Sequence, residues 1–226
     1  MRRIHGWQAV CAATAVVLVA GCSSDDGAGD EIGAAGPASF FVTSRNPGNG
    51  GDLGGIGGAD AWCQYLADEA GIGNREWHAY LSVNFIDARD RIGTGPWYNV
   101  DGVLIAENIE QLHGDNNITN ETALDENGNL PAYLIEVDGE VVRADPDSLV
   151  HDVLTGTNED GTANEATCNA WGDSSPNFTA MLGHADRLGR NPGVNSWNAV
   201  HASQGCDMQS LINTGGAGMY YCFAID

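Results

Sequence analysis

The clearest pattern of hydrophobic and polar positions lies between residues 58 and 82 and predicts a helix followed by a strand. Small and apolar residues recur there at helical spacing, at Ala59, Cys63, Leu66, Ala67 and Ala70, which places them on one face of a helix. Asp60 is expected in the first helical turn, where the helix dipole favours an anion. Gly71 and Gly73 suit a helix end, and the residues from Trp77 onward predict a strand. Because Cys63 lies on the apolar face, it is expected to anchor a long-range disulfide.

Shorter apolar runs predict the strands of a sheet, at residues 40–42, 103–106, 150–157 and 218–225. The segment 132–142, AYLIEVDGEVV, predicts a hairpin, because Asp138-Gly139 supplies the positive φ angles of a tight turn between two β-rich runs. The last run, GMYYCFAI, is almost continuously apolar and predicts the central strand of the domain, with Cys222 in the core.

Three other segments carry weaker patterns. VNFIDARDRIG, residues 83–93, is compatible with a short helix that turns Phe85, Ile86 and Ile92 inward. The polar stretch 107–128 is expected to be a long surface excursion, and 181–193 is expected to be rich in loops.

The N-terminus has the features of an export signal. Two arginines precede a short apolar run, Ala9–Ala20, that is too short for a comfortable membrane span. The run ends in Val19-Ala20-Gly21-Cys22, which resembles a bacterial lipobox. The lipobox implies a signal peptide over residues 1–21 and a lipid anchor on Cys22; the alternative is an ordinary signal with an accidental cysteine. In such lipoproteins, a serine directly after the lipidated cysteine is associated with sorting to the outer membrane. Ser23 occupies this position here, so we expect an outer-membrane or cell-surface location.

The following residues, 22–38, are rich in Gly, Ala and Asp and predict a flexible tether. Residues 39–226 then form one domain, a size within the usual range. The chain has six cysteines. Cys11 would leave with the signal and Cys22 would carry lipid, so four remain, at Cys63, Cys168, Cys206 and Cys222. An even number in an exported chain implies two disulfides, and spacing leaves all three pairings open.

The formal charge of −22 argues against some partners. Nucleic-acid binding needs clustered cations at the phosphates, and adsorption to an anionic membrane face needs them as well. A solubilising acidic surface is the simpler interpretation; recruitment of cationic partners or divalent ions is the other.

The sequence contains no recognisable catalytic motif, cofactor motif or metal motif. The mature chain has five histidines, at His78, His113, His151, His184 and His201, and none forms an HxH or HxxxH pair. No GxSxG element is present. We therefore expect a binding module without catalytic activity, cofactor or metal.

The order of motifs along the chain resembles a known family. The series runs through Ala59–Gln64, His78–Ser82, the hairpin 134–142, the segment 153–162 with Thr155-Gly156-Thr157, Cys168–Trp171, Cys206, and Tyr221-Cys222-Phe223. This resembles the endostatin-like domain, a variant of the C-type-lectin-like fold found in leptospiral endostatin-like outer-membrane lipoproteins. The resemblance covers about residues 40–226. A departure is Leu154, where those relatives usually have Trp.

The resemblance implies an α+β fold with a mixed antiparallel sheet, a disulfide-anchored helix and long loops. It implies the disulfides Cys63–Cys222 and Cys168–Cys206. It also implies binding of a protein or matrix component at the cell surface, with a carbohydrate-binding module as the alternative. Calcium-dependent lectins of this fold use acidic residues that are missing here at Pro176-Asn177 and Trp197-Asn198. Animal endostatins bind zinc through N-terminal histidines, and no histidine lies near Phe40.

Three tryptophans beside loops, Trp97, Trp171 and Trp197, are candidates for ligand binding. They either pack in the core near the disulfides or form an exposed aromatic platform for a glycan or protein.

Overall fold

The structure is a computed structural model, and it describes residues 36–130, 134–137, 140–143, 150–187 and 195–226. The chain divides into two units, Met1–Ile32 and Gly33–Asp226, and all the described residues belong to the second. The predicted signal peptide, Cys22 and most of the tether lie outside the described residues. Within the described part, no helix has the length and apolar character needed to cross a membrane.

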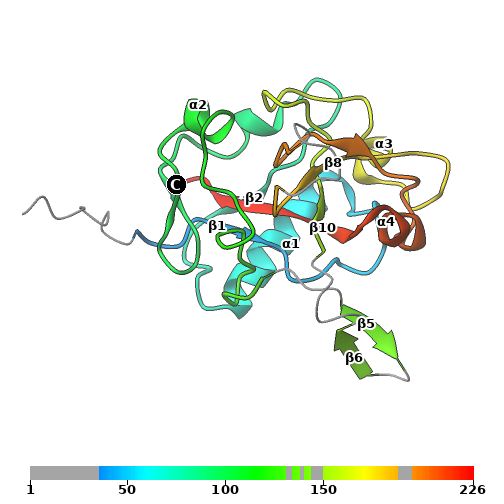
Figure 1. Cartoon of the computed structure of the whole chain (residues 1–226), viewed down its shortest axis with the longest axis horizontal. Helices are drawn as coiled ribbons and strands as arrows, with labels where there is room; N and C mark the ends of the chain where they lie inside the picture. Colours follow the sequence, from blue (N-terminus) through cyan, green and yellow to red (C-terminus); the bar gives the residue numbers. More distant parts are fainter. Residues whose placement is uncertain (1–35, 131–133, 138–139, 144–149, 188–194) are drawn as a thin grey trace, which may run out of the picture. The chain divides into compact units, whose positions relative to one another are not determined.

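A mixed sheet with β10 (Gly216–Ala224) at its centre organises the domain (Figure 1). Its C-terminal half pairs antiparallel with β1 (Phe40–Val42) and β2 (Trp77–Ala79). Its N-terminal half pairs parallel with β7 (Asp152–Leu154), and the sheet continues through β8 (Met181–His184) and β9 (His201–Ala202). The central position expected for the apolar C-terminal run is confirmed, as is the α+β class with a mixed sheet.

Apart from helix α1 (Gly55–Glu69), the other described elements are short and lie outside this sheet. They are the 3₁₀ turn Ala88–Asp90, β3 (Trp97–Tyr98), β4 (Leu104–Ala106), α2 (Ile109–Leu112), β5 (Leu134–Val137), β6 (Glu140–Arg143), α3 (Cys168–Trp171) and α4 (Met208–Thr214). The predicted hairpin is present as β5 and β6, paired antiparallel, and its turn residues lie outside the described part.

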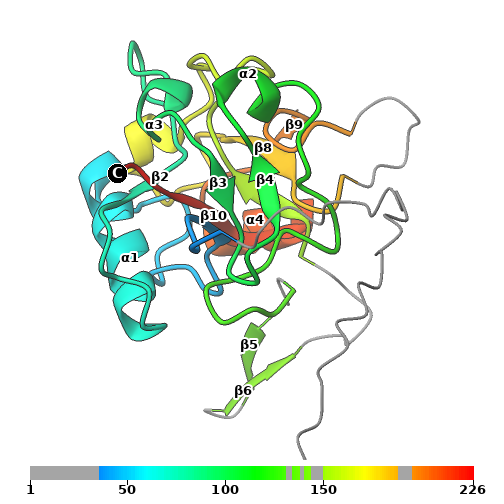
Figure 2. The same cartoon turned by 90° about the vertical axis from the view of Figure 1, so that its left-hand side faces the viewer.

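Helix α1 (Gly55–Glu69) runs beside β2 and buries the face predicted from the sequence (Figure 2). Ala59, Cys63, Leu66 and Ala67 are fully buried, and Gly71 follows with a φ of 76°. The prediction for Asp60 is wrong, because the helix begins at Gly55 and has no acid in its first turn. The Asp60 carboxylate instead accepts hydrogen bonds from the Ala79 backbone N–H at 2.8 Å and from Arg91 at 2.6 Å, which ties α1 to β2.

Two disulfides cross-link the domain. Cys63 on α1 is bonded to Cys222 on β10, and Cys168 at the start of α3 is bonded to Cys206 just before α4. These are the two pairs that the family resemblance implies. All four cysteines are fully buried, so both bonds lie in the core.

The expected helix over residues 83–93 is present only as the 3₁₀ turn Ala88–Asp90, and the first part of the segment is not helical. Val83 and Ile86 exchange backbone hydrogen bonds across a tight turn, with Asn84 at a φ of 44°. This turn leaves Phe85 fully exposed and Ile86 half exposed, and of the three expected inward residues only Ile92 is buried.

Two segments expected to be irregular are more ordered than the sequence indicated. The stretch 107–128 contains α2 and buries Leu112, Ile118 and the Glu126 carboxylate. Burial raises the pKa of Glu126, although the backbone N–H of Ser44 donates to it at 3.0 Å. The expected loop at 181–193 begins with strand β8, which is too short to show a periodic pattern.

Candidate metal centre

Three adjacent strands bring two histidines and one aspartate to the same face of the sheet. Asp152 begins β7 and lies opposite His184, the last residue of β8. His201 begins β9 and lies opposite Leu182, two residues before His184. Because side chains two apart on a strand share a face and cross-strand partners face the same way, the three side chains project together.

The donor atoms of these three residues form a compact triangle. His184 Nε2 lies 3.1 Å from Asp152 Oδ1 and 3.1 Å from His201 Nε2. His201 Nε2 lies 3.7 Å from Asp152 Oδ1. Zn²⁺ held tetrahedrally at roughly 2.0–2.1 Å separates neighbouring donors by about 3.3 Å. The triangle therefore matches one face of a metal coordination polyhedron.

Asp152 is the unusual member of the cluster. Its side chain is 0% exposed, and neither carboxylate oxygen has a hydrogen-bond partner among the described residues. A buried carboxylate without compensation is strongly unfavourable. His151 Nε2 and His184 Nε2 lie 3.3 Å and 3.1 Å from Asp152 Oδ1, so either could compensate the carboxylate if protonated. A divalent cation within the triangle would satisfy Asp152, His184 and His201 together.

The tautomer of His201 suits a ligand. Its Nδ1 lies 3.3 Å from the carbonyl oxygen of Ala202, an acceptor only. This contact holds the proton on Nδ1 and leaves the lone pair of Nε2 directed at the cluster. A hydrogen bond of this kind orients metal-binding histidines in many proteins.

His151 and Asp186 form an outer pair around this triangle. His151 Nδ1 lies 3.3 Å from Asp186 Oδ2, and His151 Nε2 lies 3.3 Å from Asp152 Oδ1. The hydrogen bond to Asp186, with a further contribution from the charge of Asp152, raises the pKa of His151 against the opposing effect of burial. His151 thus bridges two carboxylates and fixes the orientation of Asp152.

The turn between α4 and β10 lies against Asp152. A Cβ placed on Gly215 would lie 3.1 Å from Asp152 Oδ2 and 3.3 Å from His151 Nε2, and Gly215 has a φ of 131°. Only glycine adopts this conformation readily, so this turn approaches the cluster more closely than a larger residue would allow.

The donor set favours a transition metal. Two imidazoles and one carboxylate suit Zn²⁺ and its neighbours in the first row, whereas Ca²⁺ and Mg²⁺ prefer oxygen donors throughout. A second grouping, His151 with His184 and Asp186, also has donors close together. The His151 and His184 rings in it are stacked, 4.2 Å apart and 12° from parallel, so their in-plane lone pairs do not converge on one point.

Sequence reasoning did not find this cluster and predicted no metal. The ligands are far apart in the chain, at positions 152, 184 and 201, so no short spacing motif could reveal them. One of them, His184, lies in the segment 181–193, which is expected from the sequence to be rich in loops. The strand register between β7, β8 and β9 would have been needed to find them.

The three candidate tryptophans are buried. Trp97, Trp171 and Trp197 are 1%, 0% and 2% exposed. The core alternative is therefore confirmed for Trp171 and Trp197, Trp97 is buried as well, and these three residues do not form an exposed aromatic platform. The Trp171 indole N–H donates to the carbonyl oxygen of Ser82 at 2.8 Å, which satisfies its polar atom inside that core.

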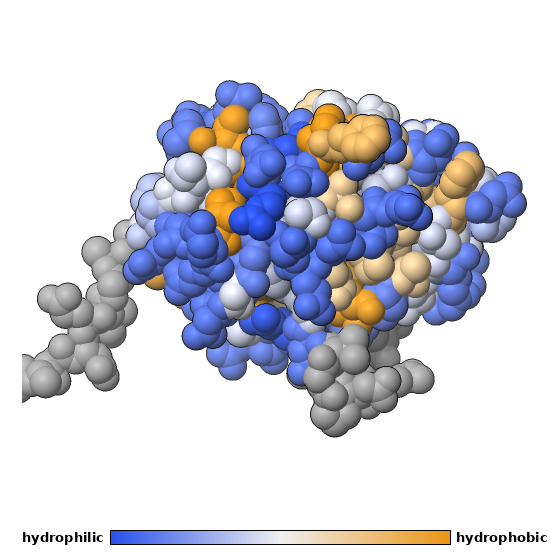
Figure 3. All heavy atoms as spheres, turned by 90° about the horizontal axis from the view of Figure 1, so that it is seen from above, coloured by the Kyte–Doolittle hydropathy of each residue, from blue (hydrophilic) through white to orange (hydrophobic). Residues whose placement is uncertain are grey.

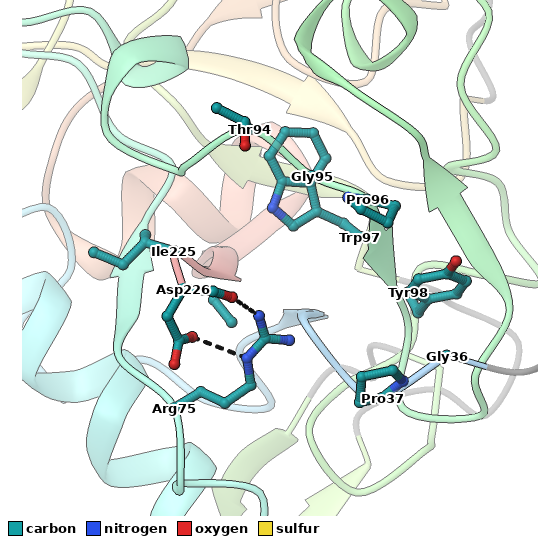
Figure 4. Close-up of a pocket in the computed structure, with 11 residues that line it drawn as sticks. Gly36, Pro37, Arg75, Thr94, Gly95, Pro96, Trp97, Tyr98, Ile225 and Asp226 are labelled. Carbon is teal, nitrogen blue, oxygen red and sulfur yellow. Dashed lines mark hydrogen bonds and ion pairs between the residues drawn. The ribbon is translucent and has the colours of Figure 1, made fainter.

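Two shallow cavities are nevertheless lined in part by these tryptophans, one by Trp97 and the other by Trp197. The first, about 360 Å³, lies near the last described residues, where Arg75 is paired with Asp226 (Figure 4). The second, about 270 Å³, has a largely polar lining that includes Glu159, Asn195 and Asn198. The face seen from above in Figure 3 is mainly hydrophilic, with separate hydrophobic patches and no broad apolar area.

Comparison with known protein families finds no family model that matches this chain. Comparison with curated proteins finds no match either. The function must therefore be argued from the site.

Proposed function

We propose that this chain is an exported, lipid-anchored binding module whose domain holds one divalent transition-metal ion, with zinc as the best fit. The observation that carries the proposal is the convergence of Asp152 Oδ1, His184 Nε2 and His201 Nε2 within 3.1–3.7 Å of one another, with the Asp152 carboxylate fully buried and without a hydrogen bond among the described residues. The ion would join β7, β8 and β9 and stabilise the face that they form.

The wider proposal includes anchoring through Cys22 at the outer membrane or cell surface and an endostatin-like variant of the C-type-lectin-like fold. The order of the sequence motifs supports this fold, as do the two disulfide pairs and the mixed α+β architecture. Fold alone does not fix function, so the metal cluster carries more weight than the resemblance.

The domain in this proposal binds a protein or matrix component and has no catalytic activity. The alternative is a carbohydrate-binding module, which is favoured by the polar cavity beside Asn195 and Asn198. A glycan array and a panel of immobilised matrix proteins, each probed with zinc, with calcium and with chelator, distinguish the two. Glycan hits without matrix binding would favour the alternative.

Metal binding is tested by calorimetric titration of the chelator-treated chain with zinc, with the metal content checked by mass spectrometry. We expect one zinc ion per chain. His184→Gln and His201→Gln remove a donor each and should weaken binding at least tenfold. His78→Gln is the matched control, because His78 contacts Arg91 and Glu76 and lies outside the cluster.

Bound zinc should also raise the thermal midpoint of the native chain, because a ligand at about 100 times its Kd adds about 2.7 kcal/mol of stability. Absence of zinc from the native chain, or equal binding by the native chain and His184→Gln, would refute the metal proposal.

A further inference from the structure

The number of protein ligands follows from the relative orientation of the imidazole rings. The His184 and His201 rings are 5.1 Å apart and inclined at 70°, so their in-plane lone pairs can meet at one point. The His151 and His184 rings are stacked, 4.2 Å apart and 12° from parallel. An ion in the plane of His184 lies well outside the plane of His151, where His151 has no lone pair to offer.

His151 also has other partners for its nitrogens. Its Nδ1 faces Asp186 and its Nε2 faces Asp152, each at 3.3 Å. Both contacts suit a residue that orients a ligand from outside the coordination sphere. Asp152, His184 and His201 are then the protein ligands, and three protein ligands leave a tetrahedral ion with one position unfilled.

We propose that the metal ion keeps this position open to solvent beside His201 and uses it to bind a carboxylate from a partner molecule. The inference rests on the metal site proposed above. It assigns the metal a role in ligand recognition in addition to its structural role.

The direction of the open position follows from burial. The side chains of Asp152 and His184 are 0% and 6% exposed, whereas that of His201 is 39% exposed. The ion is therefore enclosed on the sides of Asp152 and His184, with the turn at Gly215 lying over Asp152. Access from solvent is on the side of His201.

The class of ligand follows from local charge. Among the three protein ligands only Asp152 is anionic, so a divalent ion keeps a charge of +1 within its coordination sphere, which a carboxylate would neutralise. Asp186 lies outside that sphere, in contact with His151. The acidic surface of the chain opposes an anion at long range, but charges separated by more than about 8 Å are largely screened at physiological salt. Coordination at contact distance therefore decides binding. An acidic protein side chain and an acidic sugar both carry the carboxylate that this coordination requires.

The experiment replaces zinc with Co²⁺, whose visible absorption depends on coordination number and ligands. The cobalt-loaded chain is titrated with acetate, with azide as a second anion and imidazole as a neutral donor. We expect a saturable spectral change with acetate and with azide, with acetate at least threefold tighter than imidazole. Titrations with galacturonate and with a short Glu-containing peptide then show whether the carboxylate is better supplied by an acidic sugar or by an acidic protein side chain.

The results separate the two proposals. Failure to bind Co²⁺ would remove the metal site and this inference together. Binding of Co²⁺ with no spectral response to acetate, azide or imidazole would leave the site standing and overturn the open position. A response to imidazole that is tighter than the response to acetate would overturn the assigned ligand class.

His151→Gln provides the test of ligand number. As a positioning residue, His151 can be replaced with retention of the cobalt spectrum and of the acetate response, with metal affinity reduced by about 10- to 100-fold. If His151 were a fourth ligand, the native chain would give no anion response and the variant would gain one. His78→Gln should match the native chain in every measurement.

Discussion

At the scale of single residues, Tyr80 shows how the domain satisfies polar groups in its core. Tyr80 is fully buried, and its hydroxyl lies 2.7 Å from His113 Nε2 and accepts from Asn198 Nδ2 at 3.0 Å. The His113 Nδ1 lies 2.9 Å from the Ile109 carbonyl oxygen, so Nδ1 carries the proton and Nε2 accepts from Tyr80. Burial raises the pKa of Tyr80 and lowers that of His113, so both stay neutral near pH 7.

Replacement of Tyr80 by Phe removes this hydroxyl and leaves His113 Nε2 without this partner, whereas Asn198 Nδ2 still donates to the carbonyl oxygens of Asn158 and Glu159. We expect a loss of about 1–3 kcal/mol in the free energy of unfolding, measured by urea denaturation. Tyr65→Phe is the control, because Tyr65 is 43% exposed and surface changes usually stay within about 0.5 kcal/mol. Equal stability of the two variants would contradict the role assigned to the hydroxyl.

At the scale of elements, the disulfides differ in the length of chain that they close. Cys63–Cys222 spans a sequence separation of 159 and ties α1 to β10, whereas Cys168–Cys206 spans 38. Chain entropy gives stabilisations of roughly 5 and roughly 4 kcal/mol for loops of these lengths.

The expected result is that the double variant Cys63→Ala/Cys222→Ala loses more stability than Cys168→Ala/Cys206→Ala, by about 1 kcal/mol. Urea denaturation of both variants under oxidising conditions gives the comparison. The two variants delete the same atoms at buried positions and therefore serve as controls for each other. The reverse order would mean that loop length does not govern their contributions.

At the scale of the whole molecule, the N-terminal residues predict where the domain is anchored. If the lipobox interpretation is correct, the mature chain begins at Cys22 and carries acyl chains on it. Mass spectrometry of the N-terminal peptide from membranes should find this species, and Cys22→Ser should release the chain into the soluble fraction. An unmodified Cys22, or cleavage at another bond, would contradict the lipid anchor.

Some features of this protein were determined by the sequence alone. The apolar face of α1 could be predicted, because residues three or four apart share one side of a helix. The central position of β10 could be predicted as well, because a continuous apolar run is stable only where both faces are covered. Local patterns such as these depend on near neighbours in the chain, which the sequence specifies directly.

Other features were decided only by the tertiary structure. The sequence pattern predicts that Phe85 faces inward, but the structure exposes it. Two backbone hydrogen bonds between Val83 and Ile86 close a tight turn that directs the Phe85 side chain into solvent. The cluster of Asp152, His184 and His201 depends on strand register, which pairs Asp152 with His184 and brings His201 beside them. A shift of one residue in the register of any of these strands would turn its side chain to the other face of the sheet. Only the packed sheet could therefore bring the three donor atoms together.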